Sequence, residues 1–429
     1  FGHLFSFSRG LGITKQDLKD KGIPCVNYGE IHSKYGFKVN PEIHPLKCVE
    51  ESYLEAAPKS LLKRGDFIFA DTSEDIEGSG NFTVLDSDIP TFAGYHTVIV
   101  RHENGNNYKY LAYCFDSLEF RNQIRNAVSG IKVFSITQEI LKSSKVQLPS
   151  YPEQTAIATY LDRKTTEIDE LIADKKRLLE LYDEEKIAVI NQAVTKGINT
   201  DLSMKESCIE WLGKIPAHWE VKKLKHIKAK EKNAFVDGPF GSNLKTQHFV
   251  ENGEVYVIDS GFVTSGAFEY KRDFKTITAE HFETVKRSEC RAGDIVIAKI
   301  GANFGMTGIL PELDKPSLVS GNSLKLSVNS NLHEVKFIQF QLLCLKWAGE
   351  IDLLVKGSAQ PALSMGTMAE LNFAIPNSKE EQQFIVNHIE TECNRINKQV
   401  ARTKKLIDLL KEFREALISE VVTGKTKVI

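Results

Sequence analysis

The side chains best suited to chemistry in this sequence are amides and cations on glycine-containing loops. The clearest case is the segment AKIGANFGMTG, which carries Lys299 and Asn303. A lysine can donate to the acceptor atoms of guanine, and an asparagine amide can form two hydrogen bonds with adenine. The chemistry that these residues offer is therefore hydrogen bonding to base edges rather than bond making or breaking.

Other polar side chains of the second half of the chain extend this set. Lys245, Asn322 and Gln360 lie in the segments DGPFGSNLK, SGNSLKL and GSAQPALS. Asn322 and Gln360 are equally suited to cap turns or to satisfy backbone groups. The run KKLKHIKAKEK could neutralise phosphates, or it could form a solvated face of a helix or strand.

The first half offers a different group of candidates. The loop ADTSEDIEGSGN supplies Ser73 and Asn81, and His96 follows in AGYHTVIV. This loop is acidic, so Asp75 and Glu77 disfavour phosphate contact unless a carboxylate accepts from a cytosine amine. His96 is also suited to packing or to solvation. These three residues are nevertheless the DNA-binding candidates of the first half.

No enzymatic site is recognisable. The sequence has no GxxxxGK[ST], HExxH, GxSxG or EF-hand pattern. SRGLGI and GPFGSN lack the GxGxxG spacing behind a strand, which favours turns over cofactor loops. The Asn-Pro-Pro-aromatic loop with which an amino-methyltransferase holds a flipped base is also missing. We therefore expect a protein that is not an enzyme, with no catalytic residue, no cofactor and no metal.

Length and composition limit the class of protein. A chain of 429 residues suggests roughly two to four domains. No long apolar run and no apolar leader segment occurs, so neither a membrane span nor a secretory signal is expected. Seven cysteines without a CxxC pair indicate reduced thiols and a cytoplasmic location. Because the net charge is only −2, a nucleic-acid binder would need locally concentrated positive charge.

The elements that must position these loops occur twice. LPSYPEQTAIATYL and IPNSKEEQQFIVNHI are two versions of one strand, proline, Glu-Gln and helix junction, with Gln154 matching Gln382. The offset of 228 residues holds for about forty further positions. The turns at Gly65-Asp66 and Gly293-Asp294, each followed by a short apolar run, match at the same offset and predict strands that enter a sheet. The whole chain is therefore a tandem duplication.

Each junction launches a long helix. Apolar residues recur at alternating steps of four and three through both copies, which is a heptad pattern without internal proline or glycine. A generic coiled coil with an external partner would explain this stripe, but pairing of the two copies explains it better. From Glu153 to Gly197 there are seven basic and ten acidic residues, whereas Lys379 to Ile429 has ten basic and eight acidic ones. Opposite charge balance is consistent with pairing.

These observations predict an α+β fold with two β-rich domains joined by two long antiparallel helices in a pseudo-two-fold tandem repeat. The expected boundaries are residues 1–150, 151–197, 198–376 and 377–429, for the first domain, the first helix, the linker with the second domain, and the second helix. The second repeat begins with WLGKIPAHWEVKKLKHI, and no counterpart precedes Phe1. We therefore expect the first domain to be incomplete at its N-terminus.

The motifs resemble one known family over essentially the full chain. SCIEWLGKIPAHWEVKKLK is similar to the linker into the second recognition domain of type I restriction-modification specificity subunits. DGPFGSNLK, GDIVIAKIG, SGNSLKL, GSAQPALSMGTMAELNFAIP and the two Pro to Glu-Gln junctions add to this resemblance. The first domain departs more from the pattern, because it lacks the entry linker, a glutamine like Gln360 and the asparagine of SGNS.

The resemblance implies a non-catalytic DNA-binding subunit. Each domain would read one half of a bipartite double-stranded target, and the helices would space the halves. Two methyltransferase (modification) subunits would dock on it, and restriction/translocase subunits would join the full complex. A DNA-binding specificity scaffold for another class of methyltransferase or nuclease would show the same architecture. An enzyme with an unrecognised site is the third alternative.

Overall fold

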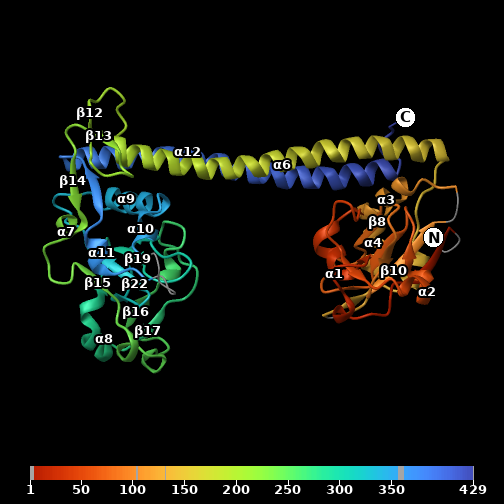
Figure 1. Cartoon of the computed structure of the whole chain (residues 1–429), viewed down its shortest axis with the longest axis horizontal. Coiled ribbons are helices and arrows are strands. Elements are labelled where there is room, and N and C mark those ends of the chain that lie inside the picture. The colour runs from red at the N-terminus through yellow and green to blue at the C-terminus, as the bar shows by residue number, and fades with distance from the viewer. Residues whose placement is uncertain (1–3, 103–104, 131, 356–361, 429) are drawn as a thin grey trace. The chain divides into compact units, whose positions relative to one another are not determined.

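The computed structural model describes residues 4–102, 105–130, 132–355 and 362–428. The chain divides into two compact units: unit 1 is Phe1–Arg177 with Thr403–Ile429, and unit 2 is Leu178–Arg402. Each unit therefore contains one globular domain and a part of both long helices (Figure 1). Gln360, one of the candidate residues, lies outside the described residues.

The globular part of unit 1 contains two main sheets. Their strand orders are β1-β10-β6-β8-β3 and β4-β2-β9-β5, and β2 and β9 are parallel. The first sheet consists of β1 (Phe5–Arg9), β10 (Thr97–His102), β6 (Phe67–Ala70), β8 (Phe82–Leu85) and β3 (Lys38–Val39). The second consists of β4 (Lys47–Val49), β2 (Ile23–Val26), β9 (Thr91–Ala93) and β5 (Leu61–Leu62).

Unit 2 repeats this arrangement except for the edge strand β3, which has no counterpart among the described strands of its first sheet. Its sheet orders are β15-β22-β19-β20 and β17-β16-β21-β18, and β16 and β21 are again parallel. The first sheet consists of β15 (Phe235–Asp237), β22 (Ser323–Leu326), β19 (Ile295–Ala298) and β20 (Thr307–Ile309). The second consists of β17 (Lys275–Ile277), β16 (Val255–Ile258), β21 (Ser317–Val319) and β18 (Glu289–Cys290). The tandem duplication is therefore visible in the topology.

The repeated Gly-Asp turn explains how the central strand of each first sheet begins. Gly65 and Gly293 have φ values of 87° and 88°, a backbone conformation that favours glycine. The carboxylates of Asp66 and Asp294 then accept from the backbone N–H three residues earlier, each at 2.8 Å. All four residues of β6 and of β19 are buried. Such continuous apolar strands are expected where a sheet is covered on both faces.

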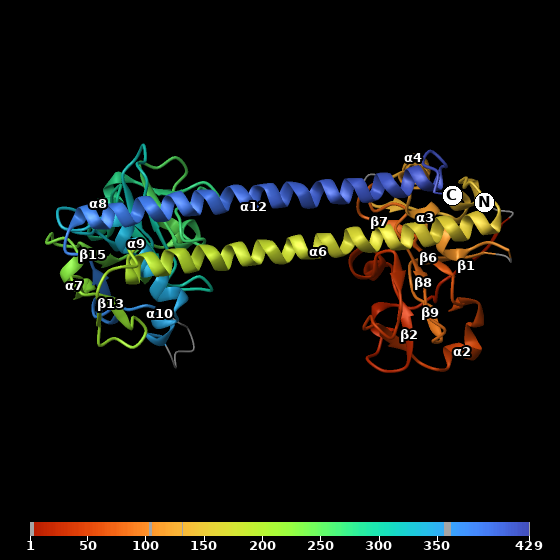
Figure 2. The same ribbon diagram turned by 90° about the horizontal axis from the view of Figure 1, so that it is seen from above.

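The two long helices pair within each unit. They are α6 (Tyr151–Lys196) and α12 (Lys379–Val422). In unit 1, Nε of Arg414 lies 3.1 Å from Oδ1 of Asp169, and in unit 2, Nη2 of Arg395 lies 2.6 Å from Oε1 of Glu185. The start of each helix lies beside the end of the other, so the expected antiparallel pairing is confirmed (Figure 2). Among the helices of the described ranges, none has the length and hydropathy of a membrane-spanning segment.

The helices also belong to the core of each domain. In unit 1, Leu161 of α6 and Ile418 of α12 are buried in one cluster with Phe115. In unit 2, Ile190 of α6 and Ile389 of α12 are buried in one cluster with aromatic and aliphatic domain residues. Burial of this kind stabilises by roughly 1.5–3 kcal/mol for each large aliphatic side chain. Each domain is thus packed firmly against its part of the helix pair.

The repeated glutamine connects each long helix to a helix of the adjoining domain. Oε1 of Gln154 accepts from the backbone N–H of Asn107 at 2.9 Å, and Oε1 of Gln382 accepts from that of Glu334 at 2.8 Å. Asn107 and Glu334 immediately precede α3 (Tyr108–Asp116) and α9 (Val335–Trp347). The Nε2 groups of the glutamines donate to the carbonyls of Pro149 and Pro376. The same joint is therefore built twice.

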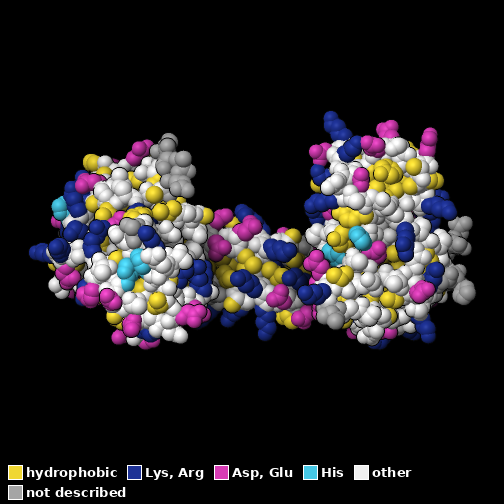
Figure 3. All heavy atoms as spheres, turned by 90° about the horizontal axis from the view of Figure 1, so that it is seen from below, with side chains coloured by type: hydrophobic (Ala, Val, Ile, Leu, Met, Phe, Trp, Pro, Cys, Tyr) yellow, Lys and Arg dark blue, Asp and Glu magenta, His cyan; other side chains and the backbone are white. Residues whose placement is uncertain are grey.

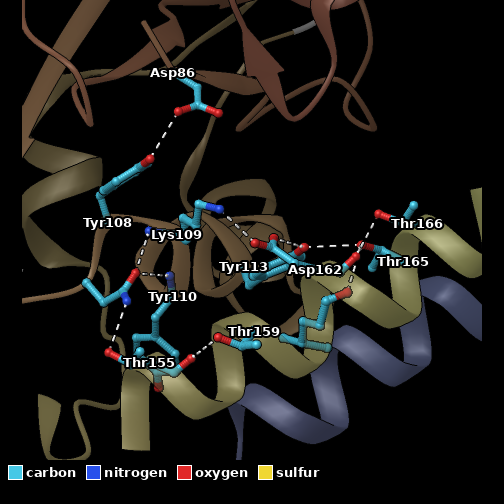
Figure 4. Close-up of polar contacts among 12 residues, drawn as sticks. Asp86, Tyr108, Lys109, Tyr110, Tyr113, Thr155, Thr159, Asp162, Thr165 and Thr166 are labelled. Carbon is cyan, nitrogen blue, oxygen red and sulfur yellow. Dashed lines mark hydrogen bonds and ion pairs between the residues drawn. The ribbon is translucent and has the colours of Figure 1, made fainter. Parts of the chain in front are cut away.

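An ion pair completes the joint. In unit 1, Nζ of Lys109 lies 2.9 Å from Oδ2 of Asp162, whose Oδ1 accepts from the hydroxyl of Tyr113 at 2.7 Å (Figure 4). In unit 2 the equivalent ion pair joins Lys336 and Glu390. The tyrosine hydroxyl contact has no counterpart there, because Phe340 takes the corresponding position in the sequence. The joint thus combines repeated contacts with contacts specific to one unit.

Candidate nucleic-acid interface

The candidate loops of the two domains lie on the same backbone scaffold. The N–H of Asp71 donates to the carbonyl of His96 at 3.0 Å, and the N–H of Lys299 donates to that of Asn322 at 2.9 Å. The carbonyls of Asp71 and Lys299 then accept from Ile136 and Leu363 at 2.8 and 3.1 Å. Equivalent backbone positions therefore carry different side chains in the two units.

The candidates of unit 1 lie together. Ser73, Asn81 and His96 line one open groove of about 710 Å³, with Tyr28 and His32 beside them. The register of β10 against β6 explains part of this arrangement, because it places Thr97, directly after His96, opposite Ala70 at the start of the candidate loop. Three residues that are up to 23 positions apart in the sequence are thus brought to one surface.

Hydrogen bonds determine which of these side chains can turn toward a ligand. Oδ1 of Asn81 accepts from Nη1 of Arg121 at 2.7 Å, and its Nδ2 lies 2.9 Å from Nδ1 of His32. Ser73 is buried. His96, by contrast, is 56% exposed, with Nδ1 at 3.2 Å from Oδ1 of Asp71 and its ring edge-on to Tyr28. His96 is therefore the candidate of this groove with the greatest access to solvent.

The groove of unit 1 is bordered by carboxylates. Glu74, Asp75 and Glu77 all line it. Oδ1 of Asp75 accepts from the N–H of Gly78 at 2.5 Å, which holds the loop in a turn. Carboxylates repel phosphates but accept from base amines, such as the cytosine amine in the major groove. This surface is therefore suited to base edges more than to the sugar-phosphate backbone.

Lys299 of unit 2 is held inside the domain. Its Nζ lies 3.0 Å from Oδ2 of Asp237 and 3.9 Å from the ring centroid of Phe240. The other carboxylate oxygen of Asp237 pairs with Arg287. The lysine side chain is only 10% exposed. In this arrangement the ammonium group of Lys299 stabilises the loop that carries Phe240.

The other candidates of unit 2 are exposed and only partly grouped. Asn322 lines a hollow of about 260 Å³ together with Phe240, Leu244 and Lys275. Lys245 directly follows Leu244, and its backbone N–H donates to Nδ1 of His248 at 3.1 Å. Asn303 is exposed on the loop before β20 and does not line this hollow. The structure thus places Asn322 and Lys245 on neighbouring loops and Asn303 elsewhere.

Two lysines of the basic run at residues 222–232 are already engaged. Lys223 and Lys225 each place Nζ 2.6 Å from a carboxylate oxygen of Glu370. These two cations lower the pKa of Glu370 to about 2. One of these two positive charges is therefore balanced within unit 2, which makes this run a weaker phosphate-binding candidate than its composition indicates.

A basic and aromatic surface in unit 2 was missed by the sequence interpretation. It borders a groove of about 870 Å³, and its basic and aromatic members are Lys271, Arg272, Lys275, Lys315, Phe249, Tyr256, Tyr270 and Phe274. Glu251 and Asp273 also line the groove, and Lys271 and Arg272 are paired with Glu269 and Asp259. Lys275 and Lys315 lie over the rings of Phe249 and Tyr256, at 5.2 and 5.3 Å. Cations interleaved with aromatic rings are typical of nucleic-acid surfaces. The segment YKRDFKT carries part of this signal.

This surface continues into the hollow beside Asn322, because Phe249 and Lys275 line both. The polar loops and the basic groove of unit 2 therefore form one connected surface. Lys and Arg side chains are numerous on the face of unit 2 shown in Figure 3 (left-hand body), interspersed with Asp and Glu. This face is therefore mixed in charge, and among the described residues of unit 2 positive charge free of ion pairs is limited to single side chains such as Lys275.

Known proteins share both the sequence pattern and the fold. Residues 2–181 and 216–405 match the family described as type I restriction modification DNA specificity domain. The type I restriction enzyme MjaVIII specificity subunit of Methanocaldococcus jannaschii is 24% identical over 337 residues, which are 77% of this chain and 74% of that protein. The MjaIX specificity subunit of the same organism is 24% identical over 357 residues, covering 81% and 76%.

Two solved structures have the same fold. One comes from work on complex assembly and conformational transition of the type I R-M system, with a TM-score of 0.68, 13% identity and coverage of 98% and 97%. The other is the HsdS subunit from Thermoanaerobacter tengcongensis, with a TM-score of 0.54, 14% identity and the same coverage. The α+β fold with two domains joined by long helices is thereby confirmed. Since the matching segments cover most of both repeats, the chain belongs to the family of type I restriction-modification DNA specificity subunits.

Proposed function

We propose that each unit reads one half of a bipartite double-stranded DNA target. Unit 1 would use the groove around Asn81 and His96, and unit 2 the connected surface around Asn322 and Lys275. The observation that carries this proposal is the pair of equivalent backbone hydrogen bonds, Asp71 to His96 and Lys299 to Asn322. The same backbone arrangement presents different side chains in the two units, as recognition of two different DNA sequences requires.

The chemistry of the two surfaces supports an asymmetric target. The unit 1 groove is bordered by carboxylates, which accept from base amines. The unit 2 surface combines exposed amides with lysines and aromatic rings, which suit base acceptors and phosphates. The two halves of the target would therefore differ in their donor and acceptor patterns, and the salt dependence of binding would arise mainly at unit 2.

The partners would be two methyltransferase subunits, with restriction/translocase subunits in the full complex. Support comes from the joint, which is built twice and so offers two similar attachment regions. Farther along the helices from these joints, equivalent leucines are exposed: Leu409 in unit 1 is 49% exposed, and Leu181 in unit 2 is 43% exposed. In unit 1, Leu406 and Phe413 extend this apolar stripe along α12. Exposed apolar stripes on paired helices suit a partner helix.

Methyl transfer and cleavage would be carried by these partners. In the described ranges, no group of three or more His, Cys, Asp or Glu side chains is arranged to hold a metal. We expect the chain alone to transfer no methyl group to DNA when it is mixed with S-adenosylmethionine. Measurable transfer by a preparation free of methyltransferase would contradict a purely recognising role.

Mapping the methylated adenines in the host genome tests the proposal directly. The expected result is one motif of two short defined sequences separated by a spacer of fixed length. Replacing side chains of the unit 1 groove should then change only one of the two sequences. A single uninterrupted motif, or loss of both halves from a well-folded single-unit variant, would overturn the proposal.

A further inference from the structure

The loop that follows β1 in unit 1 and the loop that follows β15 in unit 2 differ in length. Gly10 and Gly238 are equivalent: their N–H groups donate to Thr97 and Ser323 at 3.1 and 3.2 Å. A Cβ at either glycine would lie within about 2 Å of a carbonyl oxygen, at 1.9 Å from Gly94 and 2.0 Å from Ser320. Neither position therefore has room for a side chain, and both glycines fix the point at which the loop begins.

The loops end at equivalent 3-10 turns. In unit 1, the N–H of Thr14 donates to Oδ2 of Asp17 at 2.7 Å, and in unit 2 the N–H of Lys245 donates to Nδ1 of His248 at 3.1 Å. From Gly10 to Thr14 is four residues, whereas from Gly238 to Lys245 is seven. The loop of unit 2 is thus three residues longer than that of unit 1.

The longer loop carries an exposed aromatic ring. Phe240 is 47% exposed, whereas the short loop of unit 1 buries Leu11 and Ile13 and exposes only Gly12 between them. Since unit 1 has the four equivalent strands of this sheet in the same order without such a ring, Phe240 is not needed to form the fold. An exposed aromatic ring without a packing role is a candidate for ligand contact.

The ring is supported from beneath. Nζ of Lys299 lies 3.9 Å from its centroid and is itself held by Asp237 at 3.0 Å. Pro239 and Gly241 flank Phe240 in the sequence. The proline ring and the positive φ of Gly241, 55°, restrict the backbone conformation of the loop. A buried cation under one face and a constrained backbone both restrict where the ring can move. The side chain is therefore presented in one orientation.

The neighbours of Phe240 indicate DNA rather than protein as the occupant. Asn322 and Lys275 share its hollow, and Lys245 follows on the same loop. The carboxylate of Asp259, which also lines the hollow, is paired with Arg272. Within the described residues, neither Lys245 nor Lys275 takes part in an ion pair, and Lys275 lies over Phe249 instead. An apolar ring surrounded by an amide and free cations matches a base step with its flanking phosphates.

We propose that Phe240 is an aromatic wedge that packs against a base of the half-site read by unit 2 and locally unstacks it. Apolar side chains inserted at base steps open the stack at a cost of a few kcal/mol, which further contacts offset. Lys299 is the positioning residue that holds the ring. Because the short loop of unit 1 offers no such ring, the distortion is confined to one half of the target. This inference rests on the proposed DNA-reading role of unit 2.

Base-analogue fluorescence tests the wedge. The assembled complex with its methyltransferase is bound to duplexes of the mapped target that carry 2-aminopurine at successive single positions in both halves. The methylated adenines are left unsubstituted, because the methyltransferase takes these bases out of the stack in either half. At the remaining positions, unstacking should raise the fluorescence at one step of the unit 2 half-site. Phe240→Ala should abolish this rise and weaken binding roughly 5- to 150-fold, as expected for loss of one base-aromatic stack. Phe240→Trp should keep the rise, and Leu332→Ala, another exposed apolar position of unit 2, should change neither quantity.

Three other outcomes would overturn the inference. The rise could persist in Phe240→Ala, or it could occur equally in both half-sites of the wild-type complex. Alternatively, Phe240→Ala could lose the methyltransferase in size-exclusion chromatography while the remaining complex binds DNA normally, which would assign the ring to a protein contact. A wild-type complex that fails to bind the mapped target would overturn the proposed function, and this inference with it.

Discussion

Nζ of Lys299 lies 3.0 Å from Oδ2 of Asp237, and both side chains are mostly buried in unit 2. Removing one member of a buried ion pair leaves the other charge without full compensation. We therefore expect Lys299→Met to lower the free energy of unfolding of unit 2 by roughly 3 kcal/mol, as measured by denaturant unfolding. Arg291→Met, at an exposed cation of the same unit, should change it by less than about 0.5 kcal/mol. An unchanged stability in Lys299→Met would show that this ion pair is not formed.

The two units should control separate halves of the target. His96→Ala should weaken recognition of the unit 1 half-site by roughly 1 kcal/mol, because the ring can offer one hydrogen bond to a base edge. Asn322→Ala should weaken recognition of the unit 2 half-site by roughly 1–3 kcal/mol if a two-hydrogen-bond base contact is lost. The measurement is methylation by the assembled complex on duplexes mutated in one half or the other. Equal losses at both halves from either variant would indicate an effect through assembly or stability instead.

The joint glutamines should stabilise the attachment of each domain. Gln382→Leu removes the acceptor for the backbone N–H of Glu334 and should cost roughly 2 kcal/mol, because a partly buried donor is left unsatisfied. For a unit of this size the melting temperature should fall by roughly 4–8 °C. Gln383→Ala, at the adjacent exposed position, is the matched control and should melt within about 1–2 °C of the wild type.

A buried histidine should make unit 2 sensitive to acid. His333 is 3% exposed, and burial, with a smaller contribution from Lys222, lowers its pKa to about 4. The unfolded chain takes up this proton near pH 6.5, so the native state loses stability as the pH falls from about 6.5 to 4. The loss should reach roughly 3 kcal/mol.

The comparison of His333→Gln with the wild type isolates this effect. The variant should lose less stability between pH 7 and pH 4.5, by roughly 2–3 kcal/mol, in urea titrations at the two pH values. His388→Gln, at an exposed position of α12, should retain the wild-type dependence. Parallel pH profiles for all three proteins would contradict the assignment to His333.

The length of the helix pair should determine the spacer between the half-sites. Inserting one heptad into both helices, between residues 177 and 178 and between residues 402 and 403, adds about 10 Å of helix. That length corresponds to about three base pairs at 3.4 Å each, so the mapped motif should gain a spacer of that size. A well-folded double insertion with an unchanged motif would contradict this role of the helices.

Local signals in the sequence were enough to predict the architecture. The heptad spacing, the Glu-Gln junctions and the Gly-Asp turns are short-range patterns, and each marks an element that the structure contains. Repetition made them stronger, because a match at a constant offset is hard to obtain by chance. The confirmed pairing of α6 and α12 follows from the same apolar stripes.

The candidate site was harder to predict because it depends on long-range contacts. The sequence predicts that Lys299 donates to a base. In the structure its ammonium group instead contacts Asp237 and Phe240, which lie about sixty residues earlier in the sequence. The basic groove also combines the segment around Lys271 with Lys315, which no local pattern connects. Base contact by Lys245, Lys299, Asn303, Asn322, Gln360, Ser73, Asn81 and His96 stays a prediction for the half-site experiments.

The glutamine joint described above bonds to main-chain atoms. Gln154 and Gln382 contact backbone N–H and C=O groups, and the residues that provide the N–H differ, asparagine in one unit and glutamate in the other. A contact of this kind does not depend on which side chain is present. A domain that also supplies a cation for the ion pair and an apolar face for the shared core would fit the same socket. We therefore expect a domain exchanged at the junctions to keep its attachment, without redesign of the helices, when it preserves these contacts.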